Sequence, residues 1–207
     1  NIGARFDDRI TGKIDEFSPK SKKIHIDIDP SSINKIIKVD LALVGDVKEV
    51  IKGINQTLKK KNIDLKKSNK QKIAKWWEQI QKWRTKNSLN FINSDETIKP
   101  QHAVKRLYEL TKDKDTFITT EVGQHQMWAA QHYKFNKPNR WMTSGGLGTM
   151  GYGLPAAVGV QIAHPKKLVV DIAGEASVLM TMQEMSTAVQ YNLPIKIFIL
   201  NNQYMGM

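Results

Sequence analysis

The fold is decided by residues 168–207, which read LVVDIAGEASVLMTMQEMSTAVQYNLPIKIFILNNQYMGM. An apolar, β-branched run at 168–172 predicts a strand, and Met and Leu recur at helical spacing over 178–191. Pro194 ends that helix, and a second apolar run at 195–200 predicts another strand. Strand, helix and strand in this order indicate one right-handed βαβ unit of a parallel sheet.

Polar side chains follow both predicted strands. Glu175 lies just past the first strand, and Asn202 lies just past the second. Parallel neighbours lie about 5 Å apart, so a carboxylate and an amide oxygen converge if these strands pair. Such oxygens, completed by water, suit Mg²⁺ that also binds a phosphate. Oxygens more than about 8 Å apart would exclude a single Mg²⁺ with bonds near 2.1 Å.

The turn between the first strand and its helix is built from small residues. Gly174, Ala176 and Ser177 let a phosphate approach the backbone N–H groups at the positive end of the helix. An ordinary strand–turn–helix, in which the glycine only makes the turn, explains the same residues equally well. The stretch alone therefore leaves both interpretations open.

Several longer motifs resemble one family. The motif Gly174-Glu175-Ala176, followed after a spacer by Asn201-Asn202, resembles the thiamine-diphosphate motif usually written GDG, spacer, NN. The large, catalytic subunit of acetolactate synthase (acetohydroxyacid synthase) has segments similar to GARFDDRITG, EVGQHQMWAAQ, SGGLGTMGYGLPAA and LNNQYMGM. The resemblance covers nearly the whole chain. It is strongest over 3–12 and 117–207 and weakest over the Lys-rich 55–97.

The resemblance implies a transferase of branched-chain amino-acid biosynthesis. Such an enzyme decarboxylates pyruvate on thiamine diphosphate and transfers the hydroxyethyl group to pyruvate or 2-oxobutyrate, giving 2-acetolactate or 2-aceto-2-hydroxybutyrate. The family implies a homodimer or tetramer with shared active sites, a possible small regulatory subunit, and a bacterial-type cytoplasmic or an organellar location. Another thiamine-diphosphate carboligase or oxidase is the closest alternative, because the motif specifies the cofactor better than the acceptor.

The resemblance also implies which residues contact the cofactor. For thiamine diphosphate these are Val122, Gly123, Gln124, His125, Gly148, Met150, Gly174, Glu175, Ala176, Ser177, Asn202, Tyr204, Gly206 and Met207. Gly148 and Met150 orient the cofactor, whereas Mg²⁺ is held by Glu175, Asn202 and the backbone carbonyl of Tyr204. The family usually has Asp where this chain has Glu175, so binding is expected to persist with altered strength or metal preference.

No catalytic residue is assigned to this chain by the resemblance. The glutamate that activates the cofactor belongs to the family's N-terminal domain, and neither Glu121 nor Glu184 is given that role. The chain begins without Met and stops at Met207 within a motif. We therefore interpret it as an internal fragment that is inactive alone.

A flavin site is the second cofactor site that the resemblance implies. FAD has a structural role in that family, and its implied contacts here are Arg5, Asp8, Arg9, Ile10, Asp27, Ile28, Asp46 and Val47. Arginine can reach a diphosphate, and acids at strand ends can accept from ribose or adenine. Without the resemblance, the first four charged residues, from Arg5 to Arg9, would be interpreted as pairing with one another on the surface.

The glycine-rich loop at 145–153 has an alternative interpretation. Gly146, Gly148 and Gly151 satisfy G-x-G-x-x-G between a predicted strand and a predicted helix, and Asp171 follows at the distance of a ribose-binding acid. A nicotinamide-dependent dehydrogenase is thus a competing hypothesis. The surplus of glycines and the second phosphate signature at Gly174 count against it.

Composition limits the remaining possibilities. The 207 residues contain no cysteine, which excludes disulfides and thiolate metal sites, and no apolar run approaches the roughly 18 residues of a membrane span. The net charge of +12 suggests nucleic acid, yet the excess lies largely in a lysine tract over 59–86. Trp76, Trp77 and Trp83 occur at helical spacing there and are predicted to pack one helix face onto its domain. Neither a nucleic-acid nor a membrane partner is expected.

The predicted fold class is α/β, with parallel-sheet domains that carry helices on both faces. Residues 1–97 are expected to be the end of a central, FAD-binding-type domain with its linker, and 98–207 most of a C-terminal thiamine-diphosphate and Mg²⁺ domain. Strands are predicted at 23–29, 41–44, 116–120, 141–144, 168–172 and 195–200. Helices are predicted at 31–38, 47–58, 70–87, 101–110, 126–132, 154–163 and 178–191, and residues 1–12 are predicted to form a loop.

Overall fold

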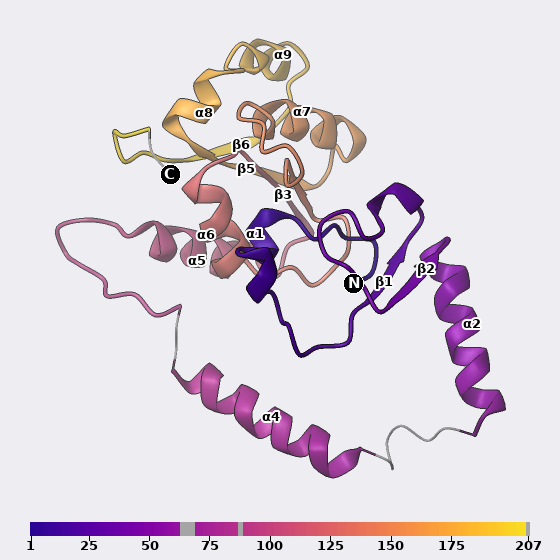
Figure 1. The fold of residues 1–207 in the computed structure, drawn as a ribbon. Coiled ribbons are helices and arrows are strands. Elements are labelled where there is room, and N and C mark those ends of the chain that lie inside the picture. Colours follow the sequence, from indigo (N-terminus) through magenta and orange to yellow (C-terminus); the bar gives the residue numbers. More distant parts are fainter. Residues whose placement is uncertain (63–68, 87–88, 206–207) are drawn as a thin grey trace. The chain divides into compact units, whose positions relative to one another are not determined.

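The computed structural model describes residues 1–62, 69–86 and 89–205 (Figure 1). It divides into two compact units, Asn1–Lys86 and Asn87–Met207. The first contains α1 (Asp8–Thr11), η1 (Ile14–Glu16), β1 (Ile24–Asp27), η2 (Pro30–Ser32), β2 (Leu41–Val44), α2 (Val47–Lys60) and α4 (Lys70–Thr85). The second contains α5 (Pro100–Thr111), β3 (Thr116–Thr120), α6 (Gln124–His132), β4 (Trp141–Thr143), α7 (Gly153–Ala163), β5 (Leu168–Gly174), α8 (Glu175–Leu179), α9 (Glu184–Gln190) and β6 (Lys196–Leu200).

The second unit is built on a four-stranded parallel sheet. Its strand order is β4-β3-β5-β6. Strand β5 therefore lies between β3 and β6, and its last residue, Gly174, pairs with Leu200 at the end of β6. Because all four strands run the same way, their carboxyl ends meet at one edge of the sheet, where ligands bind in open α/β folds.

Helices cover both faces of this sheet. On one face, Ile118, Val170 and Ile172 pack with Val104 of α5 and Ala129 of α6. On the other face, the alternate residues of the same strands pack against α7 in two clusters, made of Phe117, Ala157 and Val169, and of Leu154, Ala173 and Val178. Figure 1 shows α7, α8 and α9 on one side of the sheet and α5 and α6 on the other. The alternation follows from the two-residue period of a strand that is buried on both faces.

The predicted α/β class with parallel sheets is confirmed, but one predicted helix is wrong. Residues 178–191 were expected to form a single helix, whereas α8 ends at Leu179 and α9 begins only at Glu184. Within the break, the Thr181 hydroxyl donates to the backbone oxygen of Gly151 at 3.1 Å. We attribute the interruption to this tertiary contact, which the periodicity of Met and Leu cannot reveal.

The first unit has a two-stranded parallel sheet. Strands β1 and β2 pair in register from Ile24 and Leu41 onward, and Ile2 extends the sheet through an isolated parallel bridge to Ile26. The segment 1–12, predicted to be a loop, contains the one-turn helix α1. The helix predicted at 31–38 is wrong, because Asn34 takes a left-handed conformation at φ 58° and its side chain accepts from the Val39 N–H. That local turn competes with a helix.

The tryptophans of the lysine tract do not pack as predicted. Helix α4 has no buried residue, and Trp76 and Trp83 contact each other edge to face with 5.4 Å between ring centroids. The domain boundary expected near Thr97 stays a prediction. The division into two compact units falls earlier in the sequence, after Lys86. In the part of the chain that the structure describes, no helix is both long and apolar enough to cross a bilayer.

Candidate functional site

Two side chains converge at the carboxyl ends of β5 and β6. Glu175 begins α8 directly after β5, and Asn202 follows β6 by one residue. The backbone N–H of Tyr204 donates to Glu175 Oε1 and to Asn202 Oδ1, at 3.0 Å in each case. Because both oxygens lie 3.0 Å from the same nitrogen, the distance between them is at most twice 3.0 Å, which is 6.0 Å. This separation is inside the limit of about 8 Å beyond which one Mg²⁺ could not bind both.

A cavity of about 380 Å³ opens beside this pair. Its lining includes all twelve of the predicted thiamine-diphosphate residues that the structure describes. These are Val122, Gly123, Gln124, His125, Gly148, Met150, Gly174, Glu175, Ala176, Ser177, Asn202 and Tyr204. The other two, Gly206 and Met207, lie outside the described residues. Segments that are distant in sequence thus supply one cavity.

Three further residues line the cavity that sequence reasoning missed: Trp128, Leu200 and Met205. Trp128 stands one turn after Gln124 on α6, so helical spacing from a predicted contact was a usable signal. Leu200 is the last residue of β6 and Met205 follows Tyr204. Neither carries a signal beyond its nearness in sequence to the Asn201-Asn202 motif.

Glycine is required where His125 packs into the cavity wall. A Cβ on Gly174 would lie 2.9 Å from His125 Nδ1, and one on Gly123 would lie 2.7 Å from His125 Cε1. Gly123 also has a φ of 154°, which residues with a side chain rarely adopt. The two glycines therefore allow the imidazole to sit between the end of β3 and the end of β5.

His125 is a buried imidazole with one unsatisfied nitrogen. It hydrogen-bonds to the backbone of Glu121, whereas its Nε2 has no partner among the described residues. Burial lowers the pKa of His125 to about 4, and the bond to Glu121 and the charge of Glu175 only partly oppose this shift. The ring is therefore neutral at pH 7. Because the bond to Glu121 uses the single proton of the neutral ring, the unpartnered nitrogen is an acceptor and is suited to a ligand group that donates.

The anion-binding helix end that was expected after β5 is weaker than predicted. Helix α8 has only five residues, Glu175–Leu179, so few peptide dipoles add at its start. The Ser177 hydroxyl is already used, since it donates to the Gly174 backbone oxygen at 3.1 Å. A phosphate in this cavity would depend on individual N–H groups, on a cation and on neighbouring side chains more than on the helix dipole.

Few ionisable groups are available for a metal. Among residues 1–62, 69–86 and 89–205, no group of three or more His, Cys, Asp or Glu side chains is placed to hold an ion. The predicted ligand set contains one carboxylate, one amide oxygen and one backbone carbonyl. Such a sparse set of oxygens matches Mg²⁺, which keeps several waters and shares a ligand phosphate, better than a metal that needs a full protein cage.

The dehydrogenase hypothesis requires Asp171 to be accessible to a ribose, and the structure buries this residue. Asp171 is fully buried in the middle of β5, where its Oδ1 accepts from the Thr119 hydroxyl at 2.9 Å. Burial, together with the charge of Glu121, raises the pKa of Asp171 to about 7. A buried acid beneath α7 cannot accept from a ribose hydroxyl, which is the role that the nicotinamide fingerprint requires of it.

The predicted FAD residues lie in two groups within the first unit. Asp27 ends β1 and Ile28 follows it, whereas Asp46 and Val47 follow β2, at the same edge of the two-stranded sheet. Both acids also serve the local fold. The Asp27 carboxylate accepts from the Asp29 N–H at 2.9 Å, and the Asp46 carboxylate caps α2 through the N–H groups of Lys48 and Glu49.

The second group of predicted FAD residues belongs to the N-terminal segment. Arg5 forms an ion pair with Asp7 at 3.5 Å, which is the surface pairing considered from the sequence. Asp8, Arg9 and Ile10 lie on the one-turn helix α1, and Ile10 is exposed. The flavin site stays a prediction.

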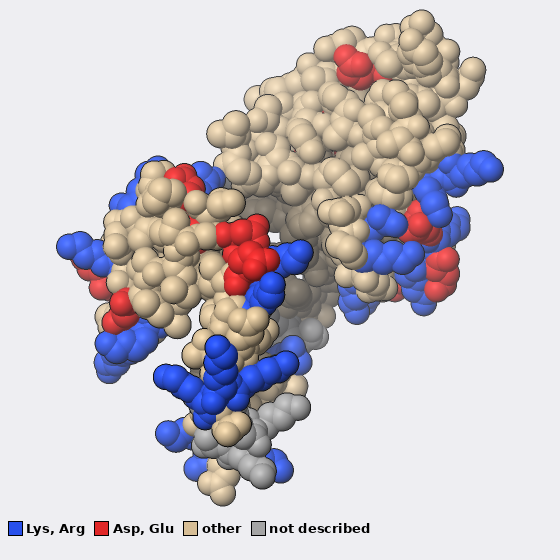
Figure 2. Space-filling view, turned by 90° about the vertical axis from the view of Figure 1, so that its right-hand side faces the viewer, with Lys and Arg blue, Asp and Glu red and all other residues tan. Residues whose placement is uncertain are grey.

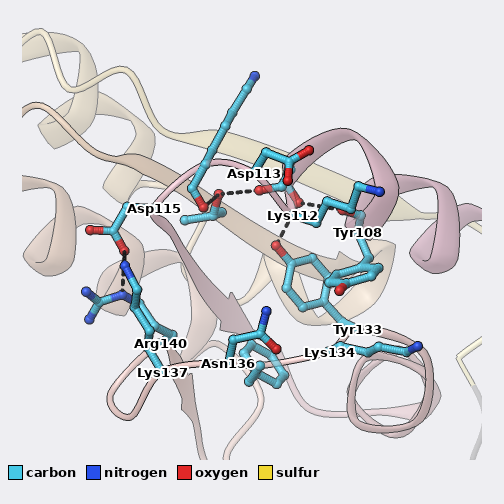
Figure 3. Close-up of a pocket in the computed structure, with 13 residues that line it drawn as sticks. Tyr108, Lys112, Asp113, Asp115, Tyr133, Lys134, Asn136, Lys137 and Arg140 are labelled. Atoms are coloured by element: carbon cyan, nitrogen blue, oxygen red, sulfur yellow. Dashed lines mark hydrogen bonds and ion pairs between the residues drawn. The ribbon is translucent and has the colours of Figure 1, made fainter.

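A second cavity, of about 280 Å³, lies at the opposite end of β3 (Figure 3). Its ion pairs centre on Asp115, which contacts Arg140 at 3.0 Å, Lys137 at 3.3 Å and Lys167 at 2.9 Å. Hydrogen bonds from Lys167 and Arg140 hold the pKa of Asp115 well below its usual range. No residue predicted from the sequence to bind a cofactor lines this cavity, and its lining carries more cationic than anionic side chains.

In comparison with known proteins, two parts of the chain match two different family models. Residues 121–207 match the family model described as thiamine pyrophosphate enzyme, C-terminal TPP binding domain, and residues 1–54 match the central domain of the same enzymes. The whole chain is 50% identical over 206 residues to an acetolactate synthase large subunit of Buchnera aphidicola subsp. Schlechtendalia chinensis. It is 45% identical over 206 residues to the acetolactate synthase isozyme 3 large subunit of Escherichia coli and to the chloroplastic acetolactate synthase 1 of Nicotiana tabacum. The chain spans 35%, 35% and 30% of the lengths of these relatives.

Proposed function

We propose, because this chain belongs to the thiamine pyrophosphate enzymes, that the protein containing it is the catalytic subunit of an acetolactate synthase. The reaction joins two 2-oxo acids: pyruvate loses carbon dioxide, and the remaining hydroxyethyl group is transferred to pyruvate or to 2-oxobutyrate. The products are 2-acetolactate and 2-aceto-2-hydroxybutyrate, precursors of valine, leucine and isoleucine. Thiamine diphosphate, when bound, supplies the carbanion-stabilising chemistry of this transfer.

The observation that carries the proposal is the convergence of Glu175 and Asn202 on one nitrogen, beside the cavity that the predicted cofactor residues line. The two oxygens would hold Mg²⁺, together with the Tyr204 backbone carbonyl. The Tyr204 N–H now lies between them, so a cation must displace this donor.

The remaining cavity residues fit the other parts of the cofactor. Gln124 is suited to the diphosphate, because its side-chain amide can donate to a phosphate oxygen. His125 would donate to the diphosphate only when its ring is protonated, because the single proton of the neutral ring is engaged with the Glu121 backbone. Val122 and Met150 supply apolar contacts to the rings, and Gly148 leaves its backbone open to the aminopyrimidine. The chain's contribution is thus to bind, orient and partly desolvate the cofactor.

We also propose the finer features that the family resemblance implies. FAD would bind the first unit with a structural role, and active sites would be shared between subunits of a homodimer or tetramer. A small regulatory subunit and a bacterial cytoplasmic or organellar location belong to the same proposal. The expectation of no nucleic-acid partner stays a prediction.

One surface of the second unit supports the proposed self-association. Residues 141–165 contain no Asp, Glu, Lys or Arg. Figure 2 shows hardly any charge over the upper part, around α7, α8 and α9, whereas charged side chains gather at the lower edge of the same unit. Leu179, Met180, Met182 and Val189 are exposed on this part of the unit. An uncharged surface with several exposed apolar side chains is typical of subunit interfaces.

The test uses the full-length protein. Thiamine diphosphate with MgCl₂ should raise its melting temperature, and pyruvate should be converted to acetolactate. Glu175→Ala should abolish the Mg²⁺-dependent part of the shift. Glu184→Ala is the matched control, because Glu184 accepts from the Thr187 hydroxyl at 3.1 Å and is absent from the described lining of the cavity.

The outcomes separate the alternatives. Stabilisation by NAD and not by thiamine diphosphate would refute the proposal in favour of a dehydrogenase. Stabilisation by thiamine diphosphate without acetolactate formation would assign the protein to another carboligase or oxidase of the family.

A further inference from the structure

A buried carboxylate stands behind the cavity and is not used by the proposed function. Glu121 directly follows β3, and 0% of its surface is exposed. Its Oε2 accepts from the Gly151 N–H at 2.6 Å, and its Oε1 accepts from the Leu154 N–H at 3.0 Å. None of the ion pairs among the described residues includes Glu121. Backbone N–H groups at the start of the eleven-residue helix α7 therefore face this side chain in place of a cation.

The two hydrogen bonds connect two segments that line the cavity. Glu121 precedes Val122 in one segment, and Gly151 follows Met150 in the other. Gly148 and Gly151, on either side of Met150, have φ angles of 68° and 85°, so this loop can take backbone conformations that a side chain would strain. A loop with that freedom needs outside contacts to keep one shape.

The sheet below gives Glu121 little freedom to move. Its own N–H donates to the Ile172 oxygen of β5 at 3.1 Å. Asp171, fully buried on the same strand, lies close enough for its ionisation to be opposed by the charge of Glu121. Gly153 lies in contact with both acids, since a Cβ there would be 2.3 Å from Asp171 Oδ1 and 2.6 Å from the Glu121 nitrogen. Because the Glu121 carboxylate is fixed relative to the sheet, its hydrogen bond to Gly151 also fixes the loop around Met150 relative to the sheet.

We infer that Glu121 is a positioning residue. Its hydrogen bonds to the backbone N–H groups of Gly151 and Leu154 hold Met150 and Gly148 against the bound cofactor. This inference rests on the proposed function. Glu121 touches neither substrate nor cofactor in this role. If Glu121 only stabilised α7, its replacement would lower the stability of the protein but leave kcat at saturating cofactor unchanged.

The test compares full-length enzyme carrying Glu121→Gln with wild type. Glutamine has the same shape but one acceptor oxygen, so one of the two N–H groups is left without a partner. At saturating thiamine diphosphate and Mg²⁺ we expect kcat to fall about tenfold or more, because a displaced cofactor is not corrected by added cofactor. In the cofactor-free protein, amide exchange at Gly151 and Leu154 should become faster.

The matched control is Thr119→Val. It removes the 2.9 Å hydrogen bond to Asp171 in the same buried cluster but leaves the acceptors of the Gly151 and Leu154 N–H groups in place. It should lower the melting temperature while leaving kcat at saturation, and exchange at those two amides, close to wild type. Should Glu121→Gln fail to fold, Glu121→Asp keeps the charge with a shorter reach and should show smaller changes in the same direction.

Several results would overturn the inference. Unchanged kcat and unchanged amide exchange in a folded Glu121 variant would do so, as would equal losses of kcat in the Thr119→Val control. These results differ from a failure of the proposed function, in which the wild-type enzyme itself would not bind thiamine diphosphate. Amide exchange at Gly151 and Leu154 needs no cofactor, so in that case it still tests whether Glu121 restrains these two backbone N–H groups.

Discussion

Adding one methyl group at Gly153 should destabilise the second unit despite the better helix propensity of alanine. The added Cβ would lie 2.3 Å from Asp171 Oδ1, 2.6 Å from the Glu121 nitrogen and 2.8 Å from the Thr120 carbonyl carbon. Non-bonded carbon contacts are favourable only near about 3.5–4.0 Å, so α7 or the strand ends must move by about 1 Å. Overpacking costs about 1–3 kcal/mol, and we expect the upper end because backbone atoms cannot rotate away.

Gly159 provides the matched control within the same helix. It is exposed, and a Cβ there meets no atom within 4 Å. Glycine is less favourable than alanine in a helix by about 0.5–1 kcal/mol, so Gly159→Ala should stabilise the protein by about that amount. The two variants make the same chemical change in one helix and differ only in the space around it.

Thermal unfolding of the cofactor-free, full-length protein measures both effects. A difference of 1 kcal/mol moves Tm by about 2–4 °C in a domain of roughly 150–250 residues. Gly153→Ala should therefore lower Tm by about 6–12 °C, and Gly159→Ala should raise it by about 1–4 °C. A Gly153→Ala variant that melts at or above wild type would refute the tight packing of α7 on β3 and β5. Equal losses in both variants would refute packing as the cause.

Three further outcomes are expected. Because burial raises the pKa of Asp171 to about 7, above the unfolded value near 3.9, stability is unaffected below about pH 4 and falls by a few kcal/mol between about pH 4 and 7. Asp171→Asn should flatten that fall in urea unfolding measured from pH 5 to 8, and an unchanged slope would contradict the assignment. The pKa of Asp115 is instead lowered by its cations, so its contribution is present above about pH 4 and lost as the pH falls below it. Asp115→Asn should make acid unfolding less steep, and a steeper transition would count against the ion-pair cluster. Ile118→Ala, at a fully buried position of β3, should cost about 2–5 kcal/mol. Ile162→Ala, 58% exposed on α7, should change stability by less than about 0.5 kcal/mol, and comparable losses for the two would contradict the core as described.

Much of the second unit could be predicted because its strands are short apolar runs with polar residues immediately after them. The predicted strand at 116–120 matches β3, and those at 168–172 and 195–200 lie within two residues of β5 and β6. Placing Glu175 and Asn202 past two strand ends required only the assumption that those strands pair, and they do.

Two features that the sequence did not reveal depend on contact between residues distant in sequence. The break before α9 depends on Thr181 reaching Gly151, and the grip of Glu121 on α7 depends on a loop thirty residues away. The short helix expected at 31–38 fails for a local reason, a turn closed by the Asn34 side chain. Residues of the cavity wall without a motif, such as Leu200, also could not be identified from one sequence.

The strand order has a consequence for how the protein is made. Among the residues that the structure describes, β6 is the last strand along the chain, pairs with β5 and precedes Asn202. A growing chain can therefore fold three strands while the binding site is still open along one side. Ribosome-bound chains of increasing length should gain protease protection from thiamine diphosphate only once the segment after β6 has emerged.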